Sequence, residues 1–229
     1  MDTVKTRPPM IMRLGVLAAL AVIAVLVVVV VTTPHKASSG GDEGTPSVLR
    51  ELDGIPQSGI TLGSPKAPVT IVEFADLQCP FCAEYERSVL PRLIDRYVRT
   101  GKVRLQLRLL RFLGPDSDRL ARVAAAASTQ NRMWQFAALA YARQGAENSG
   151  YATPEFVNRL AANAALKDLD AGAAAERQVR QSEQAARTLG INSTPSFMIG
   201  RTGASLERFQ PNDLTPEAFL PRIDRELAR

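Results

Sequence analysis

Residues 69–82 read VTIVEFADLQCPFC and contain two signals in succession. The β-branched run Val69–Phe74 is typical of a buried β-strand. Two cysteines separated by two residues, Cys79 and Cys82, come soon after it. Apolar side chains at helical spacing then run from Ala83 to Arg99, which predicts a helix. The sequence therefore places both cysteines where a buried strand passes into a helix.

A cysteine pair at such a junction has the environment of a thiol-disulfide exchanger. Free backbone N–H groups and the helix dipole stabilise negative charge at a helix N-terminus, which should lower the pKa of Cys79. A substrate thiolate can attack a Cys79–Cys82 disulfide at the Cys79 sulfur, and in the reverse direction Cys79 attacks while Cys82 resolves. The alternative is a passive bridge. That alternative is the weaker one, because closing so short a loop gives little loop-entropy stabilisation.

The rest of the pattern predicts an α/β domain with a helical segment inserted at about 114–190. The predicted strands are 59–63, 69–74, 103–110, 196–199 and 206–209. The predicted helices are 83–99, 117–144, 153–166, 171–189 and one that begins at Thr215. Pro91 should kink the first of these helices, and Asp116 or Ser117 should cap the second. Trp134 is expected in the core of the inserted segment.

Residues 14–31 form an uncharged apolar run. As a helix this run would measure about 27 Å, close to the roughly 30 Å hydrocarbon core of a bilayer. No clean small-x-small cleavage site follows it, which favours a retained membrane anchor over a cleaved signal peptide. Lys5, Arg7 and Arg13 precede the run. The positive-inside rule therefore predicts a cytoplasmic N-terminus at 1–13 and an extracytoplasmic remainder.

Residues 32–58 are rich in Ser, Gly, Pro and acidic residues, which indicates a flexible linker that leads to a folded domain at 59–229. An extracytoplasmic domain lies in an oxidising compartment, where nearby cysteines can hold a disulfide. The predicted location and the cysteine pair therefore agree with each other.

The composition argues against several classes of function. A structural zinc site needs about four Cys or His ligands, whereas the chain has two cysteines and one histidine, His35. His35 follows the predicted anchor, which argues against histidine-dependent hydrolysis. The net charge is +5, but basic and acidic residues alternate, so we expect no nucleic-acid partner. Arg104, Arg108 and Arg111 are expected on the solvated side of a strand. We expect neither a metal nor a cofactor besides the cysteine pair.

Two segments resemble the signature segments of the DsbA-like disulfide oxidoreductases, specifically the membrane-tethered bacterial type. They are residues 69–82 and residues 190–197, which read GINSTPSF. The resemblance covers about 59–229 and implies a thioredoxin-like fold with the helical segment inside it. It also implies that Pro195 follows a cis peptide bond and packs against the cysteine pair, while Thr194 offers backbone hydrogen bonds to an extended substrate.

The resemblance implies roles for further residues. Glu73 matches the position of a buried carboxylate that can accept or relay the proton of Cys82, and Asp76 is a weaker candidate for that task. Pro80 and Phe81 are expected to contact substrate together with the proline loop. Phe81 stands where the best-known oxidases carry histidine, and phenylalanine cannot donate a hydrogen bond or positive charge to a thiolate. The resemblance therefore does not predict the reduction potential of the cysteine pair.

The anchor and the cysteine pair favour an oxidoreductase that introduces disulfides into exported, cysteine-containing polypeptides. A reductant outside the cytoplasm needs a dedicated electron supply, whereas an oxidant matches the compartment. The resemblance suggests reoxidation by a membrane protein of the DsbB or vitamin-K-epoxide-reductase type. One alternative is a reductase or isomerase that uses the same pair. Another is a redox-inactive, tethered peptide-binding or chaperone module in which the pair is a static bridge.

Overall fold

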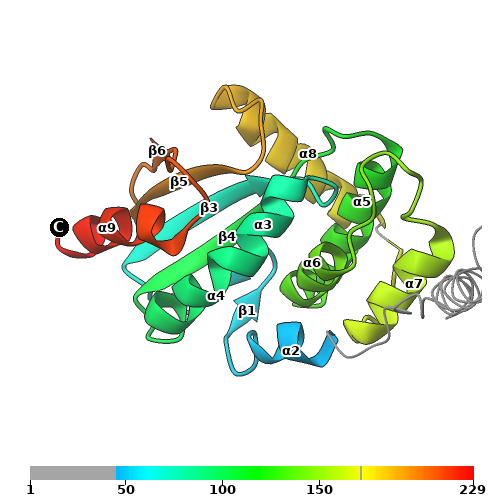
Figure 1. Ribbon diagram of the computed structural model, residues 1–229, viewed down its shortest axis with the longest axis horizontal. Coiled ribbons are helices and arrows are strands. Elements are labelled where there is room, and N and C mark those ends of the chain that lie inside the picture. The colour runs from blue at the N-terminus through cyan, green and yellow to red at the C-terminus, as the bar shows by residue number, and fades with distance from the viewer. Residues whose placement is uncertain (1–44, 171) are drawn as a thin grey trace, which may run out of the picture. The chain divides into compact units, whose positions relative to one another are not determined.

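We describe the protein from a computed structural model that defines residues 45–170 and 172–229 (Figure 1). The predicted cytoplasmic segment 1–13, the predicted anchor 14–31, His35 and most of the predicted linker lie outside the described residues. Within the described part of the chain, no helix combines the length and apolar character needed to cross a bilayer.

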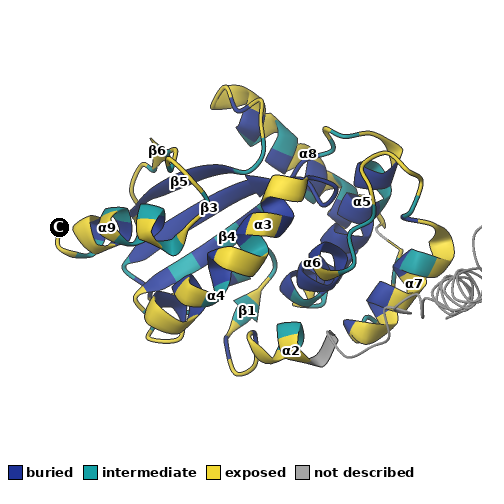
Figure 2. Ribbon diagram, in the orientation of Figure 1, coloured by how far each residue is buried: buried dark blue, intermediate teal, exposed yellow. Residues whose placement is uncertain are grey.

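A mixed sheet of six strands, in the order β1-β2-β4-β3-β5-β6, forms the centre of the fold. The strands are β1 (Gln57–Ser58), β2 (Thr61–Leu62), β3 (Val69–Ala75), β4 (Val103–Leu109), β5 (Ser196–Arg201) and β6 (Glu207–Phe209). β3 runs parallel to β4 and antiparallel to β5, and all of its residues are buried. Figure 2 shows the central strands as buried and the outer sides of the helices as exposed. The predicted buried strand at 69–74 is thus confirmed, and its mostly apolar sequence reflects cover on both faces.

The strands on one side of β3 follow the predicted pattern in part. β4 alternates buried and half-buried residues, as expected of a strand with one polar face. The single strand predicted at 59–63 is instead the hairpin of β1 and β2, which turns at Gly59. Gly59 has a φ of +58°, a conformation that glycine adopts without steric cost.

The helix predicted at 83–99 is present as three consecutive pieces. They are α3 (Pro80–Ser88), α4 (Leu90–Leu93) and the π-helical turn η1 (Ile94–Val98). The first break falls at Val89, two residues before Pro91. Proline lacks a backbone N–H and its ring clashes with the preceding turn, so the interruption predicted at Pro91 is confirmed.

Four helices lie between β4 and β5 in the chain, in the range where the sequence predicts an inserted helical segment. They are α5 (Pro115–Thr129), α6 (Met133–Ala142), α7 (Pro154–Asn163) and α8 (Gly172–Thr188). The prediction of one helix over 117–144 is wrong, because Asn131 separates α5 from α6 with a φ of +56°. Asparagine tolerates this left-handed conformation better than most residues. Its side chain also accepts a hydrogen bond of 2.9 Å from the backbone N–H of Gly59.

The first turn of α5 also differs from the prediction. Gly114 is the N-cap and Pro115 the first helical residue. Asp116 and Ser117 therefore do not cap the helix but lie buried within its first turn. Proline suits this position because its missing N–H would have no partner there.

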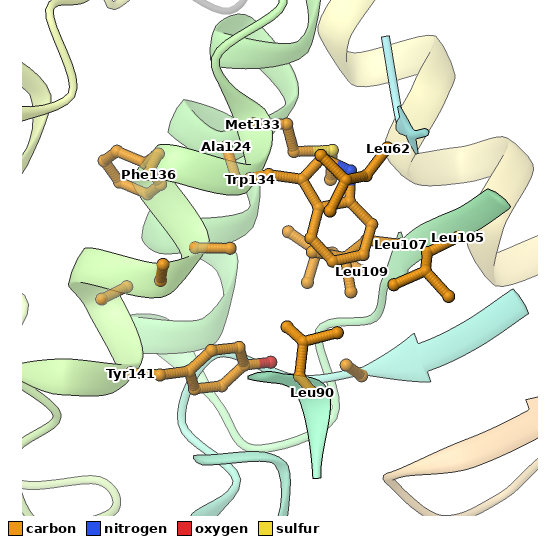
Figure 3. Packing of buried hydrophobic residues seen from close by; sticks show 14 of the residues in the cluster. Leu62, Leu90, Leu105, Leu107, Leu109, Ala124, Met133, Trp134, Phe136 and Tyr141 are labelled. Carbon is orange, nitrogen blue, oxygen red and sulfur yellow. The ribbon is translucent and has the colours of Figure 1, made fainter. Parts of the chain in front are cut away.

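Trp134 is buried, as predicted, but it joins the helical segment to the sheet. Its indole Nε1 donates a hydrogen bond of 3.1 Å to the carbonyl of Ile60, between β1 and β2. Figure 3 shows Trp134 with Met133, Leu62 and the leucines of β4 in one buried cluster. The core is therefore continuous from the sheet into α5 and α6.

Residues 45–58, which the sequence assigns to the linker, are structured. α2 occupies Thr45–Arg50, and the side chains of Leu52 and Ile55 are buried in the main core. Arg99 holds the following turn, with guanidinium hydrogen bonds of 2.8 Å to the carbonyl of Asp53 and 2.7 Å to that of Glu51. The isolated apolar residues of this stretch anchor it to the domain, so the linker prediction is wrong for its last part.

Arg104 and Arg108 lie on the polar face of β4, as predicted, although that face is half-buried, whereas Arg111 lies beyond the end of the strand. Arg104 donates a hydrogen bond of 2.9 Å to the hydroxyl of Thr70 on the neighbouring strand. Arg111 is only 18% exposed and forms ion pairs of 2.7 Å with Glu183 and 2.9 Å with Asp118. Arg111 therefore ties the end of β4 to α8 and α5.

The C-terminal helix α9 (Pro216–Leu227) begins directly after Thr215, as predicted. Its Phe219 ring lies 5.5 Å from Tyr85, 5.1 Å from Phe197 and 5.4 Å from Phe209, measured between ring centroids. Aromatic pairs at such distances stabilise the packing beyond their buried area. The cluster connects α9 to α3, β5 and β6.

Candidate active site

The cysteine pair lies at the predicted junction of strand and helix. β3 ends at Ala75, and α3 begins at Pro80. Cys79 is the N-cap of α3, with extended backbone angles, and its carbonyl accepts the N–H of Ala83 at 3.1 Å. Cys82 lies one turn further along, so both sulfur atoms belong to the first turn of the helix.

The two thiols have opposite electrostatic environments. A hydrogen bond from the Cys82 side chain, together with the backbone N–H groups of Phe81 and Cys82, lowers the pKa of Cys79 to about 6 despite partial burial. Burial, followed by its hydrogen bond to Cys79, raises the pKa of Cys82 well above its usual value. Cys82 is fully buried, whereas Cys79 retains 5% exposure. The thiolate of the reduced pair is therefore on Cys79.

The proline loop lies against this cysteine. The Thr194–Pro195 peptide bond is cis, which confirms the expectation from the resemblance. The Cys79 thiol donates a hydrogen bond of 3.3 Å to the carbonyl of Thr194. The contact between the loop and the pair is thus made by Thr194, and Pro195 is half-buried beside it.

Glu73 is a buried carboxyl on β3, beneath the cysteine helix. It is 4% exposed, and its Oε1 has no hydrogen-bond partner among the described residues. Burial, and then the neighbouring charges of Glu86 and Cys79, raise the pKa of Glu73 well above its usual value. Its charge in turn contributes to the raised pKa of Cys82. The carboxyl of Glu73 therefore holds its proton to a higher pH than an exposed glutamate does, and it is electrostatically linked to both thiols.

Asp76 is also buried, but both oxygens of its carboxylate already accept hydrogen bonds. Oδ1 accepts hydrogen bonds of 2.9 Å from the N–H of Gln78 and 2.6 Å from the hydroxyl of Ser117. Oδ2 accepts bonds of 2.8 Å and 3.2 Å from the backbone N–H groups of Phe112 and Leu113. These bonds leave Asp76 poorly suited to the proton transfer for which the sequence makes it a weaker candidate.

Side chains from the helical segment satisfy the backbone of the cysteine loop. Gln144 Nε2 donates to the carbonyls of Leu77 and Cys79, at 3.0 Å and 3.2 Å. The hydroxyl of Tyr141 donates to the carbonyl of Asp76 at 3.3 Å. The sequence analysis does not identify Gln144 or Tyr141, because both are far from the cysteines in the chain and carry no local motif.

A groove of about 620 Å³ opens beside the cysteine pair. Its lining comprises Cys79, Pro80, Phe81, Phe112, Leu113, Glu147, Ile191, Asn192, Ser193 and Thr194. The side chains of Phe81 and Phe112 are 61% and 45% exposed, although both are large and apolar. Exposed apolar side chains beside a reactive group are typical of a binding surface. Three of the four predicted substrate-binding residues line this groove, Pro195 does not, and Phe112 was not predicted.

Among the described residues, no group of three or more His, Cys, Asp or Glu side chains is placed to hold a metal ion. The chemistry that these residues can support is thiol-disulfide exchange at the Cys79 sulfur.

Comparison with known proteins agrees with the fold and with a disulfide oxidoreductase activity. A family model described as thioredoxin matches residues 56–220. The probable disulfide bond formation protein D of Bacillus anthracis is 31% identical over 149 residues, which cover 61% of this chain and 68% of that protein. A thioredoxin-like oxidoreductase from Silicibacter pomeroyi aligns with a TM-score of 0.59 at 28% identity, covering 76% of this chain and 93% of that one. Oxidised BdbD from Bacillus subtilis aligns with a TM-score of 0.62 at 21% identity, covering 76% and 98%, and supports the fold alone.

Proposed function

The chain belongs to the thioredoxin family, among its DsbA-like disulfide oxidoreductases, and we propose that it introduces disulfides into exported, cysteine-containing polypeptides. The observation that carries the proposal is the asymmetry of the cysteine pair. Cys79 lines the groove and has a pKa lowered to about 6, whereas Cys82 is enclosed. A lowered pKa stabilises the reduced form of a pair, and a stabilised reduced form makes the disulfide a stronger oxidant.

The electrons move from the substrate to the cysteine pair. A substrate thiolate attacks the Cys79 sulfur of the Cys79–Cys82 disulfide, and Cys82 leaves. A second substrate thiolate then attacks the substrate sulfur of the mixed disulfide and forms the new disulfide, while Cys79 leaves as a thiolate. Its lowered pKa makes Cys79 a good leaving group in this second step. Two electrons thus pass to the pair in each turnover.

Cys82 needs a proton when it leaves, because burial raises its pKa. Glu73 is a nearby carboxyl whose pKa is raised by burial, which favours its protonated form. We assign to Glu73 the role of proton donor to Cys82 during substrate oxidation, and of acceptor when the pair is reoxidised.

The lowered pKa of Cys79 has only a small effect on the reduction potential, and this supports a second candidate function. At pH 7, a thiol pKa of about 6 instead of 9 stabilises the reduced form by about 1.4 kcal/mol. For a two-electron couple this is about 30 mV, whereas thioredoxin and the strongest oxidants differ by about 150 mV. Phe81 offers the thiolate no hydrogen bond that would add to the effect. The same site therefore suits a reductase or isomerase if its electrons come from a membrane donor.

The location and the redox partner belong to the proposal. An anchor at residues 14–31 with a cytoplasmic N-terminus would hold the domain outside the cytoplasm, as the charge pattern before the anchor favours. Reoxidation requires an electron acceptor, for which we propose a quinone-linked membrane protein of the DsbB or vitamin-K-epoxide-reductase type.

The direct test uses the oxidised full-length chain and a reduced peptide with two cysteines. We expect stoichiometric oxidation of the peptide, and we expect Cys79→Ser to abolish it. Equilibration of the pair with glutathione decides the direction. A midpoint potential near that of thioredoxin, about −270 mV, would favour reduction instead. Unchanged peptide oxidation by Cys79→Ser would refute the catalytic assignment.

A further inference from the structure

The carboxylate of Asp76 connects two segments that are distant in the sequence. It is fully buried at the end of β3, and burial of a carboxylate is costly unless hydrogen bonds compensate it. Oδ1 faces the cysteine loop through the N–H of Gln78. Oδ2 faces the connection between β4 and α5 through the N–H groups of Phe112 and Leu113. The carboxylate of Asp76 thus links the cysteine loop to the connection between β4 and α5.

Gln78 reinforces the same connection. Its side-chain Nε2 donates hydrogen bonds of 2.9 Å to the carbonyl of Leu113 and 3.0 Å to the hydroxyl of Ser117. Its Oε1 accepts a bond of 2.8 Å from the N–H of Asn148. The polar groups that join the cysteine loop to the β4–α5 connection are therefore concentrated around Asp76.

The segments that Asp76 connects are two walls of the groove. Cys79 and Phe81 line it on the side of α3, and Phe112 and Leu113 line it from the β4–α5 connection. The Phe112 side chain is 45% exposed, so packing of the ring restrains this wall only in part. The backbone hydrogen bonds of Phe112 and Leu113 to Asp76 restrain this wall directly, together with the bond from Gln78 to the carbonyl of Leu113.

We propose that Asp76 is a positioning residue that holds the Phe112 wall in place and thereby sets the affinity for polypeptide substrates. The proposal rests on the proposed function in one respect, namely that the groove receives a polypeptide. Among the described residues, the side chain of Asp76 forms no hydrogen bond with a cysteine sulfur, and only its backbone contacts the pair. Its carbonyl accepts the N–H of Cys79 at 3.0 Å, and a backbone hydrogen bond of Asp76 reaches the Cys82 side chain. A change confined to the carboxylate should therefore alter the groove more than the reactivity of Cys79.

The test compares the oxidised full-length wild-type chain with oxidised Asp76→Asn in a single turnover with two probes, where the dependence of the rate on probe concentration gives the half-saturating concentration as KM and the limiting rate as kcat. The first is a two-cysteine peptide with phenylalanine beside one cysteine, and the second is glutathione, which is too small to need the far wall. A charge-assisted hydrogen bond contributes about 1.5–3 kcal/mol, so we expect the KM for the peptide to rise at least about tenfold. The kcat and the rate with glutathione should stay within about twofold. Amide hydrogen exchange at Phe112 and Leu113 should accelerate.

Glu226→Gln is the matched control, because Glu226 is a carboxylate with 1% exposure on α9, hydrogen-bonded to Arg229 at 3.2 Å. It should lower stability without changing KM. Should Asp76→Asn fail to fold, Ser117→Ala removes one of the four hydrogen bonds and should raise KM to a smaller extent.

Two results would overturn the proposal. One is an unchanged KM in a variant whose Phe112 and Leu113 amides exchange faster. The other is an equal loss of rate with peptide and glutathione, which would place the effect at the cysteines. If the wild-type chain only reduces such peptides, the direction proposed above is wrong, while the comparison of KM values in the reducing direction still decides the role of Asp76.

Discussion

Replacement of Cys82 by alanine should raise the pKa of Cys79, because the hydrogen bond from the Cys82 side chain is the largest cause that lowers it. A hydrogen bond to a charged group contributes about 1.5–3 kcal/mol, which corresponds to a rise of about one to two pH units. At pH 7 about nine-tenths of Cys79 is thiolate when its pKa is about 6. In the variant this fraction should fall to between about a half and a tenth.

The rate of alkylation of Cys79 by iodoacetamide, measured against pH, gives the pKa directly. Both variants in the comparison have a single cysteine, so no disulfide interferes. Cys82→Ser is the control, because its hydroxyl can still donate a hydrogen bond to the thiolate and should preserve most of the lowering. If Cys82→Ala and Cys82→Ser give the same pKa as each other, close to 6, the hydrogen bond is not the cause and the backbone N–H groups of the helix are sufficient.

Three further predictions concern charge. Above the Cys79 pKa of about 6, the reduced pair binds one proton instead of two, so its midpoint potential should fall by about 30 mV per pH unit rather than about 59 mV. Glutathione equilibration at graded pH measures this, and one constant slope would contradict the lowered pKa. The raised pKa of Glu73 means that the folded state keeps a proton which the unfolded state loses above about pH 4.5, so wild-type stability should decrease as the pH rises from there. Glu73→Gln should increase the free energy of unfolding at pH 7 in urea titrations, and it should slow peptide oxidation. If the stability of Glu73→Gln decreases with rising pH as steeply as that of the wild type, Glu73 is not the cause of that decrease. Arg111→Met should lower the free energy of unfolding by about 1.5–3 kcal/mol at pH 7, because Glu183 and Asp118 lose their partner, and by progressively less as the pH falls through the lowered pKa values of these two carboxyls. A loss of stability that does not change with pH would show that packing of the arginine, and not its charge, matters.

The features predicted correctly from the sequence are those with a local signal. The β-branched run at 69–74 indicates a strand buried on both faces, and the cysteine spacing after it indicates a helix start. The cis peptide bond at Pro195 followed from the resemblance of residues 190–197, not from their composition. Glu73 is buried, as its place in β3 and the resemblance suggested.

The features that were missed depend on contacts between distant residues. Phe112 has no motif, and its place in the groove follows from how the β4–α5 connection folds back on the cysteine loop. Residues 45–58 resemble a linker by composition, yet Leu52 and Ile55 are buried in the core and Arg99 binds two carbonyls of this segment. The break at Asn131 interrupts no hydrophobic pattern, because α5 and α6 continue the same apolar spacing on either side of it.

The hydrogen bonds from Gln144 and Tyr141 to the carbonyls of residues 76–79 bear on the modularity of the protein. A bare thioredoxin scaffold that received only residues 69–82 would leave the carbonyl of Leu77 without its side-chain donors and remove one donor each from the carbonyls of Asp76 and Cys79. An unpaired buried carbonyl is unfavourable. Any transplant of this redox centre would have to bring the helical segment along with it. The inserted helices are thus part of the redox centre, because they supply hydrogen bonds to the backbone that carries the cysteines.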